Sequence, residues 1–115
     1  MGLLDSLLSA SGIGRAFLSD AVKDAPNSMG VYQVKLKGKL MYVGKAEDGL
    51  RKRFVQYYNG TAGGYNSADN IYRHRDEVVV EWRVVRTREE CRYHEKILIQ
   101  KKNPPWNEKS GWERY

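Results

Sequence analysis

The stretch GVYQVKLKGKLMYVG, residues 30–44, predicts a β-hairpin. Residues 31–36 and 40–43 are rich in β-branched and aromatic side chains, which is typical of strands. The segment Lys37-Gly38-Lys39 between them has the composition of a short hairpin loop. The stretch therefore predicts two neighbouring strands of an antiparallel sheet.

The length of this loop decides which face of the sheet each tyrosine occupies. A three-residue loop pairs Leu36 with Leu40. The same register pairs Val34 with Tyr42. Because side chains alternate along a strand, Tyr32 and Tyr42 then share one face as diagonal neighbours. A slip of one residue would put the two tyrosines on opposite faces.

A helix is predicted after the hairpin, followed by a loop. Asp48 is a favourable N-cap residue for a helix over residues 49–58, and Asn59-Gly60 is a typical helix end. Residues 60–70 are rich in Gly, Asn, Ser and Thr, which predicts a loop.

A third strand and a second helix complete the pattern. Residues 78–85 read as a strand, and Thr87-Arg88-Glu89-Glu90 is a capping-box sequence that opens a helix over 88–101. Asn103-Pro104-Pro105 stops this helix. Residues 25–115 are thus predicted to form one α/β domain, a small three-stranded antiparallel sheet flanked by helices.

Residues 1–24 are predicted to be an N-terminal helical extension of that domain. Two apolar stripes within 3–23 indicate one helix or two short ones: Leu3, Leu4, Leu7 and Leu8, then Phe17, Leu18, Ala21 and Val22. Gly12 and Gly14 lie between the stripes and favour a break. The stripes can pack on the core, bind a protein partner through residues 3–22, or lie on a membrane surface.

Composition narrows the classes of function. A net charge of +6 and a pI near 9.5 over 115 residues favour a polyanionic partner. The single cysteine, Cys91, excludes an internal disulfide and suits a reducing compartment. No apolar run approaches the roughly 20 residues that a membrane span needs. These features predict a cytoplasmic, nucleic-acid-binding protein without a membrane span.

Glu95 is the residue whose position is hardest to explain as ordinary packing. On the helical wheel it shares a stripe with Cys91, Leu98 and Lys102, beside the predicted core. A carboxylate among core-facing residues is costly unless it is paired or binds a metal ion. The pattern leaves open an ion pair with an arginine, a metal ligand and a general acid or base.

Basic residues form two candidate phosphate-binding groups. Arg51, Lys52 and Arg53 open the helix after the hairpin, and Tyr57 lies one turn beyond Arg53. Arg53 is nearest the apolar face, and Arg51 and Lys52 suit either a solvated surface or nucleic acid. The segment Arg73-His74-Arg75 likewise suits either phosphate contact or a solvated loop.

Several motifs, taken in order, resemble the GIY-YIG nuclease family. Gly30-Val31-Tyr32 and Tyr42-Val43-Gly44 are similar to the two motifs that name the family. Residues 42–53 look especially like the incision domain of the bacterial nucleotide-excision-repair nuclease. Glu95, followed twelve residues later by Asn107, is similar to the family's catalytic glutamate and its closing asparagine.

The resemblance implies a role for each matching residue in metal-dependent cleavage of DNA. Tyr32 matches a tyrosine that acts as general base toward the attacking water, and Tyr42 matches one that contacts the same water or the phosphate. Lys45 matches a position where some members use a lysine to help lower the pKa of the tyrosine. The scissile phosphate would be held by Arg53. A single Mg²⁺ or Mn²⁺ ion would be bound by Glu95. The full set implied as catalytic is Tyr32, Tyr42, Lys45, Arg53, Tyr57, Glu95 and Asn107.

The sequence departs from the family pattern at three positions. Val31 and Val43 stand where the motif names have isoleucine, which conserves the apolar character. Gly49 resembles a one-residue insertion before the predicted helix at 49–58. This insertion leaves open whether Arg51 or Arg53 contacts the phosphate.

Three functions are compatible with these residues. The chain can be a nuclease of low sequence specificity. It can be a toxin or defence nuclease held by a protein partner. It can also be a catalytically silent nucleic-acid-binding module, which the presence of every catalytic residue type disfavours.

Overall fold

The computed structural model describes residues 12–63 and 66–107 of the chain. Its antiparallel sheet has the strand order β1-β4-β2-β3, one strand more than predicted. The strands are β1 (Ile13–Phe17), β2 (Gly30–Leu36), β3 (Lys39–Ala46) and β4 (Val79–Val84). The helices are α2 (Leu18–Asp24), α3 (Leu50–Asn59), α4 (Asn66–Arg73) and α5 (Arg88–Lys102).

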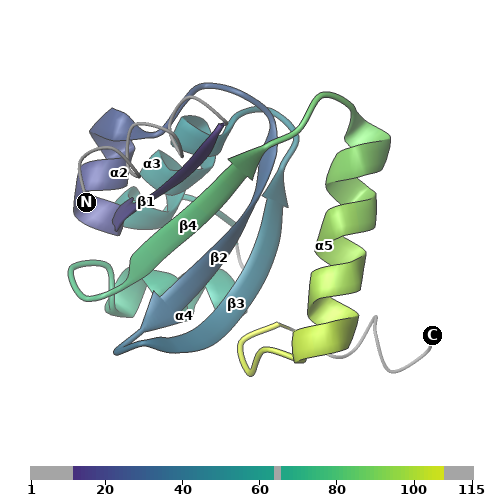
Figure 1. Ribbon diagram of the computed structural model, residues 1–115. Coiled ribbons are helices and arrows are strands. Elements are labelled where there is room, and N and C mark those ends of the chain that lie inside the picture. The colour runs from purple at the N-terminus through teal and green to yellow at the C-terminus, as the bar shows by residue number, and fades with distance from the viewer. Residues whose placement is uncertain (1–11, 64–65, 108–115) are drawn as a thin grey trace.

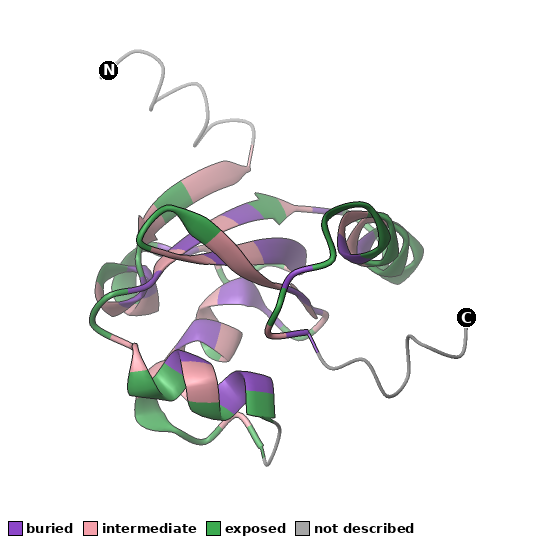
Figure 2. Cartoon of the chain, turned by 90° about the horizontal axis from the view of Figure 1, so that it is seen from below, coloured by how far each residue is buried: buried purple, intermediate pink, exposed green. Residues whose placement is uncertain are grey.

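Helices cover both faces of the sheet. Helices α2, α3 and α4 lie on one face, and α5 packs against the other side, along β2 and β3 (Figure 1). The main core fills the space between the sheet and the first three helices (Figure 2). Its largest fully buried members are Tyr32, Phe54, Leu18, Leu50, Ile71 and Val34. The predicted α/β fold is therefore confirmed.

The hairpin has the predicted register at its tyrosines but a tighter turn. Val34 pairs with Tyr42, as predicted, whereas Leu36 pairs with Lys39 and not with Leu40. Lys37 and the glycine after it both have positive φ, the geometry of a two-residue type I′ turn. An irregularity after Val34 absorbs the extra residue, so the face assignment of the tyrosines is preserved.

Residues 13–17 form strand β1, which corrects the prediction of helix at these positions. The strand pairs with β4, from Ile13 opposite Arg83 to Phe17 opposite Val79. Residues 18–24 are helical, as predicted. Residues 13–24 therefore share one sheet and one core with the rest of the fold, because β1 is part of the sheet and α2 contributes to the main core.

The predicted partner surface over residues 3–22 is described only in part. The stripe of Leu3, Leu4, Leu7 and Leu8 lies outside the described residues. A protein contact through this segment stays a prediction.

Leu18→Ala tests whether the N-terminal region belongs to the core. Leu18 is fully buried among core side chains, so its truncation removes apolar contacts and leaves a cavity. We expect the free energy of unfolding to fall by about 3 kcal/mol in chemical denaturation. Asp20→Ala, at an exposed position of the same helix, should change it by less than about 0.5 kcal/mol. Equal effects of the two substitutions would contradict this placement.

Helix α3 begins at a glycine and not at the predicted Asp48 cap. Gly49 is the N-cap, with a φ of 131° that favours glycine, and no side chain caps the helix. The first two amides of α3, from Leu50 and Arg51, donate to the backbone oxygens of Ser28 and Pro26 at 2.9 and 3.1 Å. The loop before β2 therefore satisfies the helix start.

Part of the predicted loop at 60–70 is helical. Helix α4 spans Asn66–Arg73 and buries Ser67, Ala68 and Ile71 against the core. The Gly60 stop of α3 is confirmed, since this residue adopts the left-handed conformation at the helix end.

Helix α5 has the predicted ends. Thr87 and Glu90 form a reciprocal capping box, and Asn103 ends the helix in the left-handed conformation. Cys91, a buried residue of α5, donates from its Sγ to the backbone oxygen of Gly30 at 3.2 Å. Across the described ranges, no helix is long and apolar enough to cross a membrane.

Candidate active site

Three tyrosines from three elements meet on the α3 face of the sheet. Tyr32 of β2, Tyr42 of β3 and Tyr57 of α3 have ring centroids 6.0–6.5 Å apart. The hydroxyl oxygens of Tyr32 and Tyr57 lie 2.5 Å apart and share a hydrogen bond. The predicted placement of both strand tyrosines on one face is confirmed.

Gly44 makes room for this cluster. Register places it directly opposite Tyr32, and a Cβ at this position would lie 2.5 Å from the Tyr32 hydroxyl oxygen. The same Cβ would lie 2.8 Å from the Tyr42 ring. Any larger residue would push the tyrosines apart, which gives the glycine of the second motif a packing reason.

Arg53 lies between the tyrosines and a neighbouring basic cavity. It acts electrostatically on Tyr57, one turn along α3, and borders a cavity of about 240 Å³ with Tyr42, Tyr57 and Asn107. It also borders a second cavity of about 440 Å³ that is lined by charged side chains. A guanidinium in this position can contact a phosphate in either space.

Arg51, the alternative candidate for the phosphate contact, points toward the loop before β2. Its Nε donates to the backbone oxygen of Ala25 at 2.8 Å. Lys52 is exposed and borders a small cavity with Arg53. The structure therefore brings Arg53, and not Arg51, to the tyrosine cluster.

Glu95 of α5 is close enough to the cations Lys45 and Arg53 for both to act on its charge. Burial raises the pKa of its carboxyl group, Lys45 and Arg53 lower it, and Glu47 raises it. Glu95 in turn raises the pKa of Tyr42, so it acts on the tyrosine cluster. Within residues 12–63 and 66–107 it has no ion pair, which disfavours the interpretation as a paired core carboxylate.

Burial raises the pKa of all three tyrosines, which favours their protonated forms. Burial raises the pKa of Tyr32 well above 10.0, and Tyr57 and Tyr42 raise it further. Arg53 is the positive group that lowers it. The Lys45 ammonium pairs with Glu47 at 3.1 Å and acts on Glu95, and its role in lowering the pKa of the tyrosine stays a prediction.

Asn107 holds the edge strand β3 in place. Its side-chain oxygen accepts from the Val43 amide at 2.9 Å, and its side-chain nitrogen donates to the Val43 oxygen at 2.8 Å. The neighbouring Trp106 amide donates to the Met41 oxygen at 2.7 Å. The segment after α5 thereby covers the open edge of β3.

Asn107→Ala should therefore destabilise the protein. It leaves the buried amide and carbonyl groups of Val43 without their side-chain partner, which costs about 2–4 kcal/mol. Urea denaturation measures the change, with Gln100→Ala on the exposed side of α5 as the control. A loss as small as that of the control would show that the paired hydrogen bonds do not hold the strand.

The predicted nucleic-acid-binding segment 73–75 lies at the end of α4. His74 pairs with Glu77 at 3.0 Å and stacks on Trp106, with ring centroids 5.7 Å apart. Arg75 lies over the Tyr72 ring, 4.3 Å from its centroid. A contact from Arg73, His74 or Arg75 to nucleic acid stays a prediction.

Three residues of the charged cavity were not anticipated from the sequence. Glu47, Arg88 and Arg92 line it together with Lys45, Asp48 and Arg53. The two arginines come from the first turns of α5, about 40 positions from Glu47 in the chain. No local motif joins residues so far apart, and only the fold brings them together.

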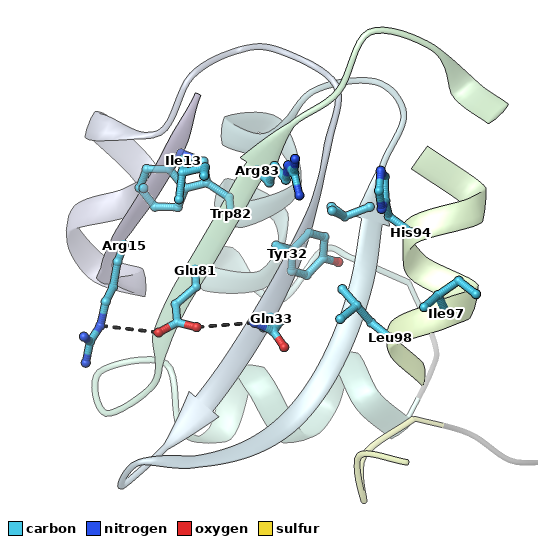
Figure 3. A pocket seen from close by; sticks show the side chains of 12 residues that line it. Ile13, Arg15, Tyr32, Gln33, Glu81, Trp82, Arg83, His94, Ile97 and Leu98 are labelled. Carbon is cyan, nitrogen blue, oxygen red and sulfur yellow. Dashed lines mark hydrogen bonds and ion pairs between the residues drawn. The ribbon is translucent and has the colours of Figure 1, made fainter. Parts of the chain in front are cut away.

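A further cavity of about 490 Å³ lies between the sheet and α5 (Figure 3). Glu81 projects into it from β4, pairs with Arg15 at 3.6 Å and accepts a hydrogen bond from Gln33 at 3.4 Å. Ile97 and Leu98 line its α5 side. Tyr32 also borders this cavity, although its ring packs edge-on against Phe54 in the main core.

Comparisons with known proteins agree with this geometry. A family model of the UvrC-like GIY-YIG domain matches residues 28–108. The UvrABC system protein C of Mycoplasmopsis agalactiae is 33% identical over 87 residues, or 75% of this chain. The chain spans 14% of the length of that relative.

Solved structures give the same result. The magnesium-bound N-terminal GIY-YIG endonuclease domain of UvrC from Thermotoga maritima matches with a TM-score of 0.64 and 32% identity, over 79% of this chain and 96% of that one. A mutant of EndoII from bacteriophage T4 matches with a TM-score of 0.57 over 90% of this chain and 97% of that one; at 18% identity it supports the fold alone. The resemblance read from the paired tyrosine motifs is thus confirmed, and the chain belongs to the UvrC-like GIY-YIG domain family.

Proposed function

We propose that this chain is a metal-dependent endonuclease domain that hydrolyses phosphodiester bonds of DNA. The observation that carries the proposal is the convergence of Tyr32, Arg53 and Glu95, which come from β2, α3 and α5. Arg53 is the link, since it acts electrostatically on both the tyrosine and the glutamate. This convergence also disfavours a catalytically silent module.

The proposed metal ligand is Glu95, with Mg²⁺ or Mn²⁺ as the ion. Its carboxylate is partly buried and has no ion pair within the described ranges, so it is available to a hard cation. With Glu95 as its one protein carboxylate, the ion would keep water molecules in most of its coordination shell. The ion would supply charge neutralisation at the reacting phosphate.

Tyr32 is proposed to take a proton from the attacking water. Its hydroxyl is positioned by the hydrogen bond to Tyr57, and the positive charge of Arg53 favours its deprotonated form. Burial raises the pKa of Tyr32, so a metal ion held near the cluster would add a positive charge that favours its deprotonated form.

Arg53 is proposed to hold the scissile phosphate through its nonbridging oxygens. Tyr42 and Tyr57 border the same cavity and can orient the phosphate or the water. Asn107 maintains β3, and with it the position of Tyr42.

The relative from Thermotoga maritima supports the choice of tyrosines. Its solved structures include three tyrosine-to-phenylalanine mutants bound to the catalytic divalent cation, and the mutated positions follow one another at intervals of 10 and 14 residues. Tyr32, Tyr42 and Tyr57 follow at intervals of 10 and 15 residues. The difference of one residue matches the insertion inferred at Gly49.

The proposal predicts that cleavage depends on a divalent cation. Incubation with supercoiled plasmid, branched DNA and RNA should show DNA nicking with Mg²⁺ or Mn²⁺, none with EDTA, and recovery when the ion is restored in excess. Full activity in EDTA would exclude a metal-dependent mechanism. Cleavage of RNA alone would leave the mechanism intact and overturn the choice of DNA.

A further inference from the structure

Three cations from two elements converge on one carboxylate beside Arg53. Lys45 Nζ and Arg92 Nε each lie 3.1 Å from Glu47 Oε2. A second contact joins Arg92 Nη2 to Glu47 Oε1 at 3.4 Å, and Arg88 Nε lies 3.8 Å from the same oxygen. Arg92 thus binds both carboxylate oxygens through one edge of its guanidinium, a bidentate geometry that arginine also uses for phosphate. We name Lys45, Arg88 and Arg92 the basic cradle.

The basic cradle is not explained by the stability of α5. Arg88 and Arg92 lie in the first two turns of this helix, where the positive end of the helix dipole disfavours cations. Their side chains are 63% and 61% exposed, and exposed ion pairs contribute little to stability. Glu47 itself is only 19% exposed, less than any of the three cations around it.

The cradle adjoins the proposed scissile position. Arg53 lines both the 440 Å³ cavity that contains the cradle and the 240 Å³ cavity that contains Tyr42 and Tyr57. The larger cavity has four cationic side chains against two acidic ones, Glu47 and Asp48. A polyanion held at Arg53 therefore passes directly into a net positive space.

We propose that the basic cradle binds a non-scissile phosphate of the DNA backbone and that Glu47 occupies this position in the free protein as an internal substitute for the phosphate. The inference rests on the proposed function and assigns a second phosphate subsite to the same substrate. When DNA binds, the phosphate takes over the contacts to Arg88 and Arg92. Glu47 then opposes binding by competing for the same donors and by like-charge repulsion.

The test measures binding of a fluorescently labelled DNA duplex by anisotropy, in EDTA so that metal binding does not contribute, over a series of salt concentrations. Arg92→Ala and Arg88→Ala should each weaken binding by about tenfold at low salt. Each should also reduce the slope of log affinity against log salt by about 0.9. Glu47→Gln should tighten binding by about three- to tenfold, and Arg92→Ala added to it should remove the gain.

Matched controls come from the cavity on the other face of the sheet. Glu81 is 23% exposed and pairs with two cations, and its partner Arg15 is 70% exposed. Glu81→Gln and Arg15→Ala therefore make the same changes in charge and burial away from the cradle. Both control variants should bind DNA within about twofold of the wild-type affinity. A general effect of net charge would appear in the control variants as well as in the cradle variants.

Unchanged or weaker binding by Glu47→Gln would overturn the role of Glu47 as a substitute for phosphate. Wild-type salt slopes in both arginine variants would overturn the subsite itself. Either result, in a wild-type protein that cleaves DNA with Mg²⁺, leaves the proposed function standing. If the cradle variants behave as expected but no metal restores cleavage to the wild type, the proposed function fails and the subsite remains.

Discussion

Glu95→Gln is expected to abolish metal-dependent DNA cleavage, with a loss of about a thousandfold or more. The substitution removes the only carboxylate proposed to hold the ion, and with it most of the charge neutralisation at the phosphate. The fold should be kept. Burial raises the pKa of Glu95 in the folded protein, so its ionised form opposes folding at neutral pH, and a neutral side chain of the same shape removes that cost.

The comparison requires a rate and a stability measurement on each variant. Single-turnover nicking of supercoiled plasmid with Mg²⁺ gives the rate, and thermal unfolding gives the stability. Glu81 is a partly buried carboxylate in the cavity between the sheet and α5, and Glu81→Gln is the control. This variant should cleave DNA within about twofold of the wild-type rate. If Glu95→Gln cleaves at the rate of this control, Glu95 is not the metal ligand.

Arg53→Ala is expected to slow cleavage by about a hundred- to a thousandfold. It removes the guanidinium that links the tyrosine cavity to the charged cavity and that lowers the pKa of Tyr32. Arg53→Lys should recover only part of the rate, because a lysine keeps the charge but not the paired donors.

Arg51→Ala is the matched control, two positions earlier on α3. Its side chain donates to the Ala25 backbone at 2.8 Å, so we expect a loss of about 1 kcal/mol in the free energy of unfolding and less than a tenfold change in rate. The reverse pattern, with the rate lost in Arg51→Ala and kept in Arg53→Ala, would assign the phosphate contact to Arg51.

The hairpin and its tyrosines could be predicted because their signals are local. Alternation of side chains along residues 31–36, with a short turn, places Tyr32 and Tyr42 on one face of the sheet. This placement is correct although the predicted loop was one residue too long, because the irregularity after Val34 restores the register. The ends of α5 were equally readable, since Thr87 and Glu90 form their capping box within four residues.

Strand β1 and helix α4 could not be predicted because their local patterns point elsewhere. In β1 the apolar residues Ile13, Ala16 and Phe17 have the spacing of a helix, and only pairing with β4 makes the segment a strand. In α4 the apolar residues are few and follow a run rich in Gly and Asn. Packing of Ile71 into the core outweighs this composition.

The charged part of the site was missed because its members are distant in the chain. Glu47 meets Arg88 and Arg92 only when α5 packs beside β3. Lys45 is on the other face of β3 from Tyr42, because side chains alternate along a strand, and it pairs there with Glu47. Motif spacing identified the residue types of the site but not which charges act on which groups.

Anomalous diffraction from crystals soaked in Mn²⁺ locates the bound ion without reference to activity. We expect one strong peak within bonding distance of the Glu95 carboxylate, on the side facing Arg53 and the tyrosine cluster, and its loss in Glu95→Gln. A strong peak at Glu47 or Glu81, with Glu95 left without an ion, would contradict this expectation.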